Sequence, residues 1–272
     1  MANIFEIIAD FKWKAAPFND IYLVMLSSSL YIGFVLLYAF TPSVRNIFKL
    51  SNTRPLVNIH NVVLCVGSLI MCVGTGYEVI KRSILERSVL WLVCESPSTE
   101  ANGALWFWSY VYYLSKYYEL IDTILQFLSN KTPPNFFLHV YHHSLVIFMS
   151  WAWIDTQASS QFVGIFMNTL VHVVMYYYFY LKSIGINPWW KSYVTSFQIV
   201  QFIFSLVIIF ITFGYSYQRL GNADDSLYPQ CKGLTTIIGS LIFNATLLKG
   251  FIDVLGKNAK PPTTKKGENK SE

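Results

Sequence analysis

Residues 21–40 read Ile21-Tyr-Leu-Val-Met-Leu-Ser-Ser-Ser-Leu-Tyr-Ile-Gly-Phe-Val-Leu-Leu-Tyr-Ala-Phe40, a run of 20 residues without a charged side chain. An α-helix needs about 20 consecutive, mostly apolar residues to cross the hydrocarbon core of a bilayer. The whole chain has the same character, because 54% of its 272 residues are hydrophobic and only 13% are charged. Soluble domains carry about 25% charged residues. The sequence therefore predicts an integral membrane protein rather than a soluble enzyme, a disordered chain or a disulfide-stapled secreted module.

Six more apolar segments follow the first, and the connections between most of them are short. We predict an all-α polytopic membrane protein in which seven transmembrane helices form a bundle around an apolar tunnel. A single membrane domain then covers residues 1–255, and residues 256–272 form a basic, disordered tail. The predicted spans are residues 21–40, 56–80, 104–128, 136–154, 162–181, 194–213 and 233–255.

The distribution of basic residues predicts the orientation of these spans. Eleven Lys and Arg residues lie in the loops after the first, third and fifth spans and in the tail. Seven lie in the N-terminal segment and the remaining loops. We therefore place the C-terminus in the cytosol and the N-terminus on the opposite side. Cys94 and Cys231 then share the oxidising side, where they are either two free thiols or a disulfide.

Polar side chains inside the spans gather in the predicted cytosolic half of the bundle, whereas the other half is aromatic and aliphatic. Ionisable residues within a membrane are costly and by default indicate a functional site. We therefore predict a reaction chamber at one end of an apolar tunnel. Its candidate residues are Lys116, Glu119, Asp122 and Thr123 on the third span, His139, His142 and His143 on the fourth, Asn168 and His172 on the fifth, and Thr195, Gln198 and Gln201 on the sixth.

Helical spacing predicts how some of these residues are arranged. His139, His142 and His143 are three and four positions apart, so they lie on one helix face. Lys116 and Glu119 are also three apart and either neutralise each other within the site or form a purely structural ion pair. We expect the amide of Asn168 to orient the imidazole of His172, which lies four residues later.

Three other polar residues of the spans have more than one interpretation. His60 is expected to make a hydrogen bond between two helices rather than to belong to the site. Among the consecutive tyrosines that follow His172, we expect Tyr176 or Tyr178 to point inward, while aromatic residues in spans more often pack or face lipid.

A cluster of histidines permits two kinds of chemistry. It resembles one histidine box of the membrane di-iron desaturases and hydroxylases, but those enzymes use more than the five histidines of this chain. Neutral imidazoles can instead act as general bases or as nucleophiles that accept an acyl group. We predict metal-free acyl chemistry, with a di-iron desaturase or hydroxylase and a non-enzymatic seven-helix transporter or receptor as alternatives. Nucleic acid is not an expected partner, because apolar runs separate the basic residues.

Four motifs resemble those of the ELO family of very-long-chain fatty acid elongases and occur in the order of that family. The resemblance covers nearly the whole chain. The motifs are Lys116-Tyr-Tyr-Glu119-Leu-Ile-Asp122-Thr123, Asn135-Phe-Phe-Leu-His139-Val-Tyr-His142-His143, Asn168-Thr-Leu-Val-His172-Val-Val-Met-Tyr176-Tyr-Tyr178 and Thr195-Ser-Phe-Gln198-Ile-Val-Gln201.

The resemblance implies a very-long-chain 3-oxoacyl-CoA synthase, an acyltransferase that condenses long-chain acyl-CoA with malonyl-CoA and releases CO₂ and CoA. It implies no cofactor and no metal. By position, His142 carries the acyl group and His172 assists the condensation, while His139 and His143 orient groups or transfer protons. Asn168, Gln198 and Gln201 would hold thioester or enolate oxygen, and Lys116 and the cytosolic basic residues would meet coenzyme A phosphates. The remaining predicted substrate-binding residues are Glu119, Asp122, Tyr176 and Tyr178.

The resemblance also implies a location and partners. The location is the endoplasmic reticulum membrane, with the N-terminus lumenal. The expected partners are acyl-CoA, malonyl-CoA, membrane lipid and the reductases and dehydratase of the elongation cycle, and a homo-oligomer is compatible with the sequence. The stretch Thr132-Pro-Pro-Asn135 lacks the Gln that often precedes the histidine motif in family members acting on polyunsaturated chains. It therefore favours saturated or monounsaturated substrates.

Overall fold

The structure is a computed structural model that describes residues 3–47, 49–221 and 231–259. Every regular element in these ranges is a helix, and the one β-type contact found there is an isolated bridge between Lys12 and Asn102. The predicted all-α membrane architecture is therefore confirmed. In chain order the helices are α1 (Ile4–Ala9), α2 (Ile21–Phe40), α3 (Pro42–Ile47), α4 (Arg54–Glu86), α5 (Ala104–Glu119), α6 (Ile121–Leu128), α7 (Phe136–Asp155), α8 (Gln161–Ser183), α9 (Lys191–Gly221) and α10 (Leu234–Ala259), with short 3₁₀ turns at Trp13–Ala15 and Leu90–Leu92.

Five of the described helices are long and apolar enough to cross a membrane, namely α2, α4, α8, α9 and α10. Their outward faces are apolar, as lipid contact requires; Leu30, Ile59 and Phe210, for example, are more than 60% exposed. The predicted count of seven spans stays a prediction. The two other candidates are α5 with α6, and α7, which carries the histidine motif.

The predicted span over residues 104–128 is not one continuous helix. It divides at Leu120 into α5, of 16 residues, and α6, of 8 residues. The cause is a tightened turn, since the Leu120 N–H donates to the carbonyl of Tyr117 and the Thr123 N–H to that of Leu120, three residues back in each case. The break lies inside the motif from Lys116 to Thr123.

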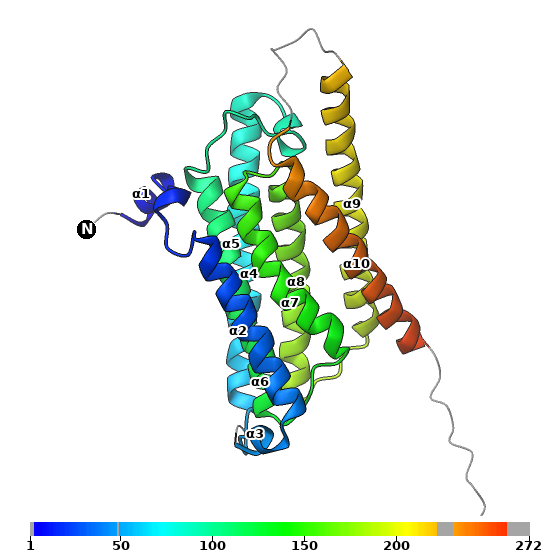
Figure 1. Cartoon of the computed structure of the whole chain (residues 1–272). Coiled ribbons are helices and arrows are strands. Elements are labelled where there is room, and N and C mark those ends of the chain that lie inside the picture. The colour runs from blue at the N-terminus through cyan, green and yellow to red at the C-terminus, as the bar shows by residue number, and fades with distance from the viewer. Residues whose placement is uncertain (1–2, 48, 222–230, 260–272) are drawn as a thin grey trace, which may run out of the picture.

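Figure 1 shows the helices packed side by side as an elongated bundle. α4 runs along α8, α7 packs against α2 and α5, and α10 lies against α9 and α7. The short helices lie at the ends: α1 beside one end, next to the start of α5, and α3 near the other (Figure 1). α10 ends at Ala259, so the first residues of the predicted tail are helical, and residues 260–272 lie outside the described part of the chain.

At the end of the bundle near α1, a disulfide joins Cys94 to Cys231. This settles the choice between a bridge and two free thiols that the sequence left open. Hydrogen bonds tie the flanking residues together: the Lys232 N–H donates to the carbonyl of Glu95, and the Glu95 N–H to the hydroxyl of Ser159. Glu95 is buried and accepts two hydrogen bonds of 2.7 Å from the Arg82 guanidinium. Segments far apart in sequence are thus fastened at one end of the helices.

Candidate active site

The most deeply buried charges lie on the last turn of α5. Lys116 and Glu119 are each 1% exposed, and the Lys116 ammonium donates to Glu119 Oε1 over 2.6 Å. His172, on α8, places Nδ1 3.4 Å from that same oxygen. The ion pair predicted from the three-residue spacing is therefore present. It extends to an imidazole on another helix, which a purely local ion pair would not do.

Asn168 holds the other side of this group. Its Oδ1 accepts hydrogen bonds from the Tyr112 hydroxyl at 3.0 Å and from Lys116 Nζ at 3.2 Å. The prediction that Asn168 orients His172 is therefore wrong, because the partner of the imidazole is Glu119. The spacing of four residues between Asn168 and His172 describes α8 alone, whereas the partner of the His172 imidazole lies on α5. Lys116 also lies 4.1 Å from the centre of the Tyr112 ring.

The predicted contact of Lys116 with a coenzyme A phosphate does not fit this arrangement. The ammonium is buried, and its charge is already neutralised by Glu119. A phosphate would have to enter the interior and displace a 2.6 Å charge-assisted hydrogen bond. The structure instead makes Lys116 part of the scaffold that holds Glu119.

Asp122, on α6 just beyond the break, binds two further helices. Its Oδ1 lies 2.9 Å from His60 Nε2 of α4, and its Oδ2 accepts a 2.7 Å hydrogen bond from the Tyr176 hydroxyl of α8. The interhelical hydrogen bond predicted for His60 is therefore confirmed, and Tyr176 points inward. Tyr178 is buried but packs against Trp190, away from this network.

The neighbouring residue, Thr123, connects two more helices. Its hydroxyl lies 2.8 Å from His139 Nε2 of α7 and 2.9 Å from the Tyr31 hydroxyl of α2. The three rings of the histidine motif do form one cluster. The ring centres of His139 and His143 are 4.3 Å apart, and those of His142 and His143 are 5.3 Å apart.

One short segment therefore supports three imidazoles from three different helices. Glu119 holds His172, Asp122 holds His60, and Thr123 holds His139. The two remaining rings, His142 and His143, each have a buried Nδ1 without a hydrogen-bond partner, and Glu119 Oε2 is also buried without one. Buried polar atoms are nearly always satisfied. His60 Nδ1 is a further buried atom without a partner. Because His142 also lines a cavity, its unpaired nitrogen indicates where a ligand or water belongs.

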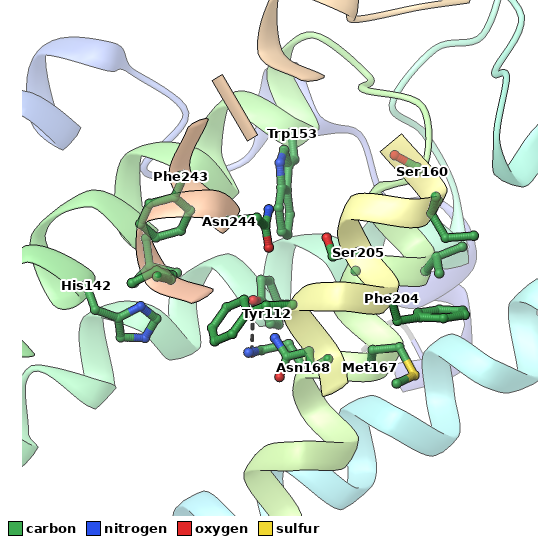
Figure 2. Close-up of a pocket in the computed structure, with 17 residues that line it drawn as sticks. Tyr112, His142, Trp153, Ser160, Met167, Asn168, Phe204, Ser205, Phe243 and Asn244 are labelled. Carbon is green, nitrogen blue, oxygen red and sulfur yellow. Dashed lines mark hydrogen bonds between the residues drawn. The ribbon is translucent and has the colours of Figure 1, made fainter. Parts of the chain in front are cut away.

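Figure 2 shows the residues that line a cavity between α7, α8, α9 and α10; His142 and Ser160 lie on opposite sides of the view. Gln201 lines it beside the polar group, and the Asn244 side chain also reaches it. The rest of the wall is mainly apolar, and its apolar side chains are those of Val146, Trp153, Val163, Met167, Phe202, Phe204, Ile208, Phe243 and Leu247. The free volume is about 50 Å³, on the order of one or two water molecules at about 30 Å³ each.

The two glutamines predicted to hold substrate oxygen differ in position. Gln201 is buried in the cavity wall. Gln198 donates to the sulfur of Met175 at 3.2 Å and does not line the cavity. Sequence reasoning missed Tyr112 and Tyr31 as members of the network. The signal for Tyr112 was its position four residues before Lys116, one turn earlier on the same helix face.

Among the described residues, no three or more His, Cys, Asp and Glu side chains are grouped so that they could hold a metal ion. The imidazoles are instead directed at a carboxylate, a hydroxyl and one another. What the arrangement offers chemically is a half-buried imidazole, His142, at the boundary between a buried polar network and an apolar cavity.

Comparison with known proteins matches residues 16–267 to a family model described as ELO, the GNS1/SUR4 family. The chain belongs to the ELO family. A protein of Dictyostelium discoideum, provisionally named as a fatty acid elongase, is 41% identical over 71% of this chain and 63% of its own length. Fatty acid elongase A of the same organism is 36% identical over 71% of this chain and 69% of its own. Very long chain fatty acid elongase 4 of Macaca mulatta is 33% identical over 65% of this chain and 56% of its own.

The aligned part of this ELO chain thus spans about two thirds or less of two of these relatives, 63% and 56%. The match to the family model nevertheless includes every residue of the polar network described above. The predicted family is confirmed, together with its multi-pass helical architecture.

Proposed function

We propose that this ELO family member is a fatty acid elongase that condenses a long-chain acyl-CoA with malonyl-CoA to give a 3-oxoacyl-CoA, CO₂ and CoA. The names of its relatives support the activity. The structural observation that carries the proposal is the position of His142. Its Nδ1 has no hydrogen-bond partner, and its ring lines an apolar cavity beside a buried network of polar groups.

In the first step, the neutral His142 imidazole attacks the thioester carbonyl of the acyl-CoA. A bond forms between the ring nitrogen and the acyl carbon, the carbon–sulfur bond breaks, and CoA leaves as the thiolate. The ring loses its proton, so that a neutral acyl-imidazole remains. An acyl-imidazole is a reactive acyl donor, and covalent catalysis of this kind divides a difficult transfer into two easier steps.

In the second step, malonyl-CoA loses CO₂ to give the enolate of acetyl-CoA. The enolate carbon attacks the acyl carbon, the bond to His142 breaks, and the ring recovers a proton. Overall, acyl-CoA and the malonyl-CoA carboxylate give 3-oxoacyl-CoA, CO₂ and the CoA thiolate, so atoms and charge balance. Hydrogen-bond donors at Asn168 and Gln201, both in the cavity wall, would stabilise the oxyanion and enolate that form there.

The substrate would lie with its acyl chain in the apolar cavity and its coenzyme head at the end of the bundle where α3, α6 and the start of α7 lie. A chain of 16 or more carbons needs more room than the cavity of about 50 Å³ provides. Exposed basic residues at that end, Lys49, Arg54, Lys131 and Lys191, are suited to the coenzyme A phosphates. We propose saturated or monounsaturated acyl chains, and no cofactor.

We place the protein in the endoplasmic reticulum membrane with the histidine-containing end towards the cytosol. The disulfide between Cys94 and Cys231 supports this orientation, since it lies at the opposite end and disulfides persist in oxidising compartments. Reductases and the dehydratase of the elongation cycle, in the same membrane, would consume the product.

The test is a condensation assay on the detergent-solubilised protein with malonyl-CoA, acyl-CoAs from C16 upward and a metal chelator. We expect 3-oxoacyl-CoA to form with the chelator present, and His142→Ala to abolish it. Tyr141→Phe is the matched control on the same turn of α7; it removes the hydrogen bond to Thr246 and should leave the rate unchanged. A folded His142→Ala protein with full activity would refute the role of His142. If no 3-oxoacyl-CoA forms and enzymatic activity appears only after iron is added, an oxygenase would be favoured instead.

A further inference from the structure

The covalent step at His142 does not use the buried group formed by Lys116, Glu119 and His172. We propose that Glu119 is a positioning residue that holds His172 as the proton acceptor of the reaction, and that Lys116 holds Glu119 in place. This inference rests on the proposed function. It assigns Glu119 and Lys116 roles other than the binding of substrate.

The contact between Glu119 and His172 sets the tautomer of the imidazole. An ionised carboxylate can only accept hydrogen bonds. His172 Nδ1, 3.4 Å from Glu119 Oε1, therefore carries the proton, and Nε2 carries the lone pair. The distance is long for a hydrogen bond, but such contacts commonly tighten only when substrate is bound. A carboxylate holds the catalytic imidazole of serine hydrolases in the required tautomer in the same way.

The position of Glu119 is itself fixed from several sides. Lys116 Nζ donates to Oε1 over 2.6 Å, and Asn168 accepts from both Lys116 and Tyr112. Because Lys116 is positive and Glu119 negative, the group with a neutral His172 has no net charge. Once His172 is protonated the group carries one positive charge, next to the place where an enolate must form. Opposite charges brought together in an interior of low dielectric attract strongly.

The proton that His172 accepts is the one that His142 loses. His142 and Asn168 line the same cavity, and Asn168 accepts a hydrogen bond from Lys116, which is paired with Glu119 beside His172. When His142 takes up the acyl group, its ring proton passes to His172 Nε2 and CoA leaves as the thiolate. When the enolate displaces His142, the same proton returns to the departing imidazole ring. His172 is thus neutral at the start and the end of the cycle and no external base is consumed.

The experiment measures CoA release from acyl-CoA alone and steady-state formation of 3-oxoacyl-CoA, for wild type, E119Q, H172Q and the double variant E119Q/H172Q. General bases contribute about 10²- to 10⁴-fold to a rate, so we expect E119Q and H172Q each to slow both reactions at least about 100-fold. Residues that act as one unit are strongly non-additive. The double variant should therefore be no slower than H172Q. E100Q, an exposed glutamate bonded to Asn102, is the control and should match wild type.

E119Q leaves the Lys116 charge buried without its partner, so a second variant separates positioning from folding. K116M/E119Q has no unpaired buried charge, and we expect it to be folded and as slow as E119Q. If this variant has wild-type rates, or if E119Q and H172Q multiply their losses in the double variant, the proposal is overturned. If wild type itself releases no CoA and forms no 3-oxoacyl-CoA, the proposed function fails. If wild type is active and E119Q equals it, only the positioning role fails.

Discussion

Replacing Lys116 by Met gives the sharpest stability test of the buried network. The ammonium is 2.6 Å from Glu119 Oε1, and the two side chains are 1% and 2% exposed. Met has about the same length of hydrocarbon but no charge, so K116M leaves the Glu119 carboxylate buried without its cation. Breaking a buried ion pair by removing one partner costs about 3–5 kcal/mol. For a chain of this size, that corresponds to a fall in Tm on the order of 10 °C.

The assay is thermal denaturation of the detergent-solubilised protein, followed by intrinsic fluorescence. K116M/E119Q should recover most of the lost Tm, because replacing both members of a buried ion pair leaves no unpaired charge in the interior. K81M is the control; Lys81 is 51% exposed and 3.6 Å from Glu78, and such surface pairs contribute about 0–1 kcal/mol. The reasoning is refuted if K116M has the same Tm as K81M. It is also refuted if the Tm of K116M/E119Q falls by as much as those of K116M and E119Q combined.

Three further predictions concern the packing and the covalent link of the bundle. Cys94→Ser should lower the Tm, and reductant should lower the Tm of wild type but not of the variant; chain entropy gives at most about 5 kcal/mol for cysteines 137 residues apart. Gly74→Ala should destabilise the protein by about 1–3 kcal/mol, because the new Cβ would lie 2.2 Å from the Trp108 ring. Gly67→Ala, which places its Cβ in open space on the same helix, should be neutral or stabilising. Equal melting temperatures of the two variants would contradict this prediction. Thr123→Val should cost about 1–3 kcal/mol and lower the condensation rate by releasing His139 and Tyr31, and a full-rate variant would show that neither bond matters.

Helix positions could be predicted well where composition alone decides them. α2 has the predicted bounds, because the charge-free run begins just after Asp20, which caps the helix, and the helix ends at Phe40, where Thr41 precedes Pro42, the first residue of α3. The break at Leu120 could not be predicted, because residues 116–123 contain neither Pro nor Gly to mark where the helix is interrupted. Whether Cys94 and Cys231 form a disulfide cannot be predicted, because the sequence carries no distance between them.

The membership of the polar network could be predicted better than its pairing. The spacing of Lys116 and Glu119 indicated an ion pair that the structure contains, because both residues lie on one turn of one helix. The partners of His172 and Asn168 were assigned wrongly, because they come from α5, and sequence spacing describes contacts within a helix only. Asp122 and His60 are 62 residues apart, so their contact depends entirely on how α4 packs against α6.

The bond between Cys94 and Cys231 also restricts how the chain threads the bilayer. Two bonded cysteines must lie on one side of the membrane, so the chain between them crosses an even number of times. α8 and α9 lie in that interval and are two of the five apolar candidates. The segment formed by α5 and α6 must therefore cross together with α7, or neither crosses. With the five candidates spanning, the total is then five or seven. Both numbers are odd, so α1 and the end of α10 face opposite compartments in either case.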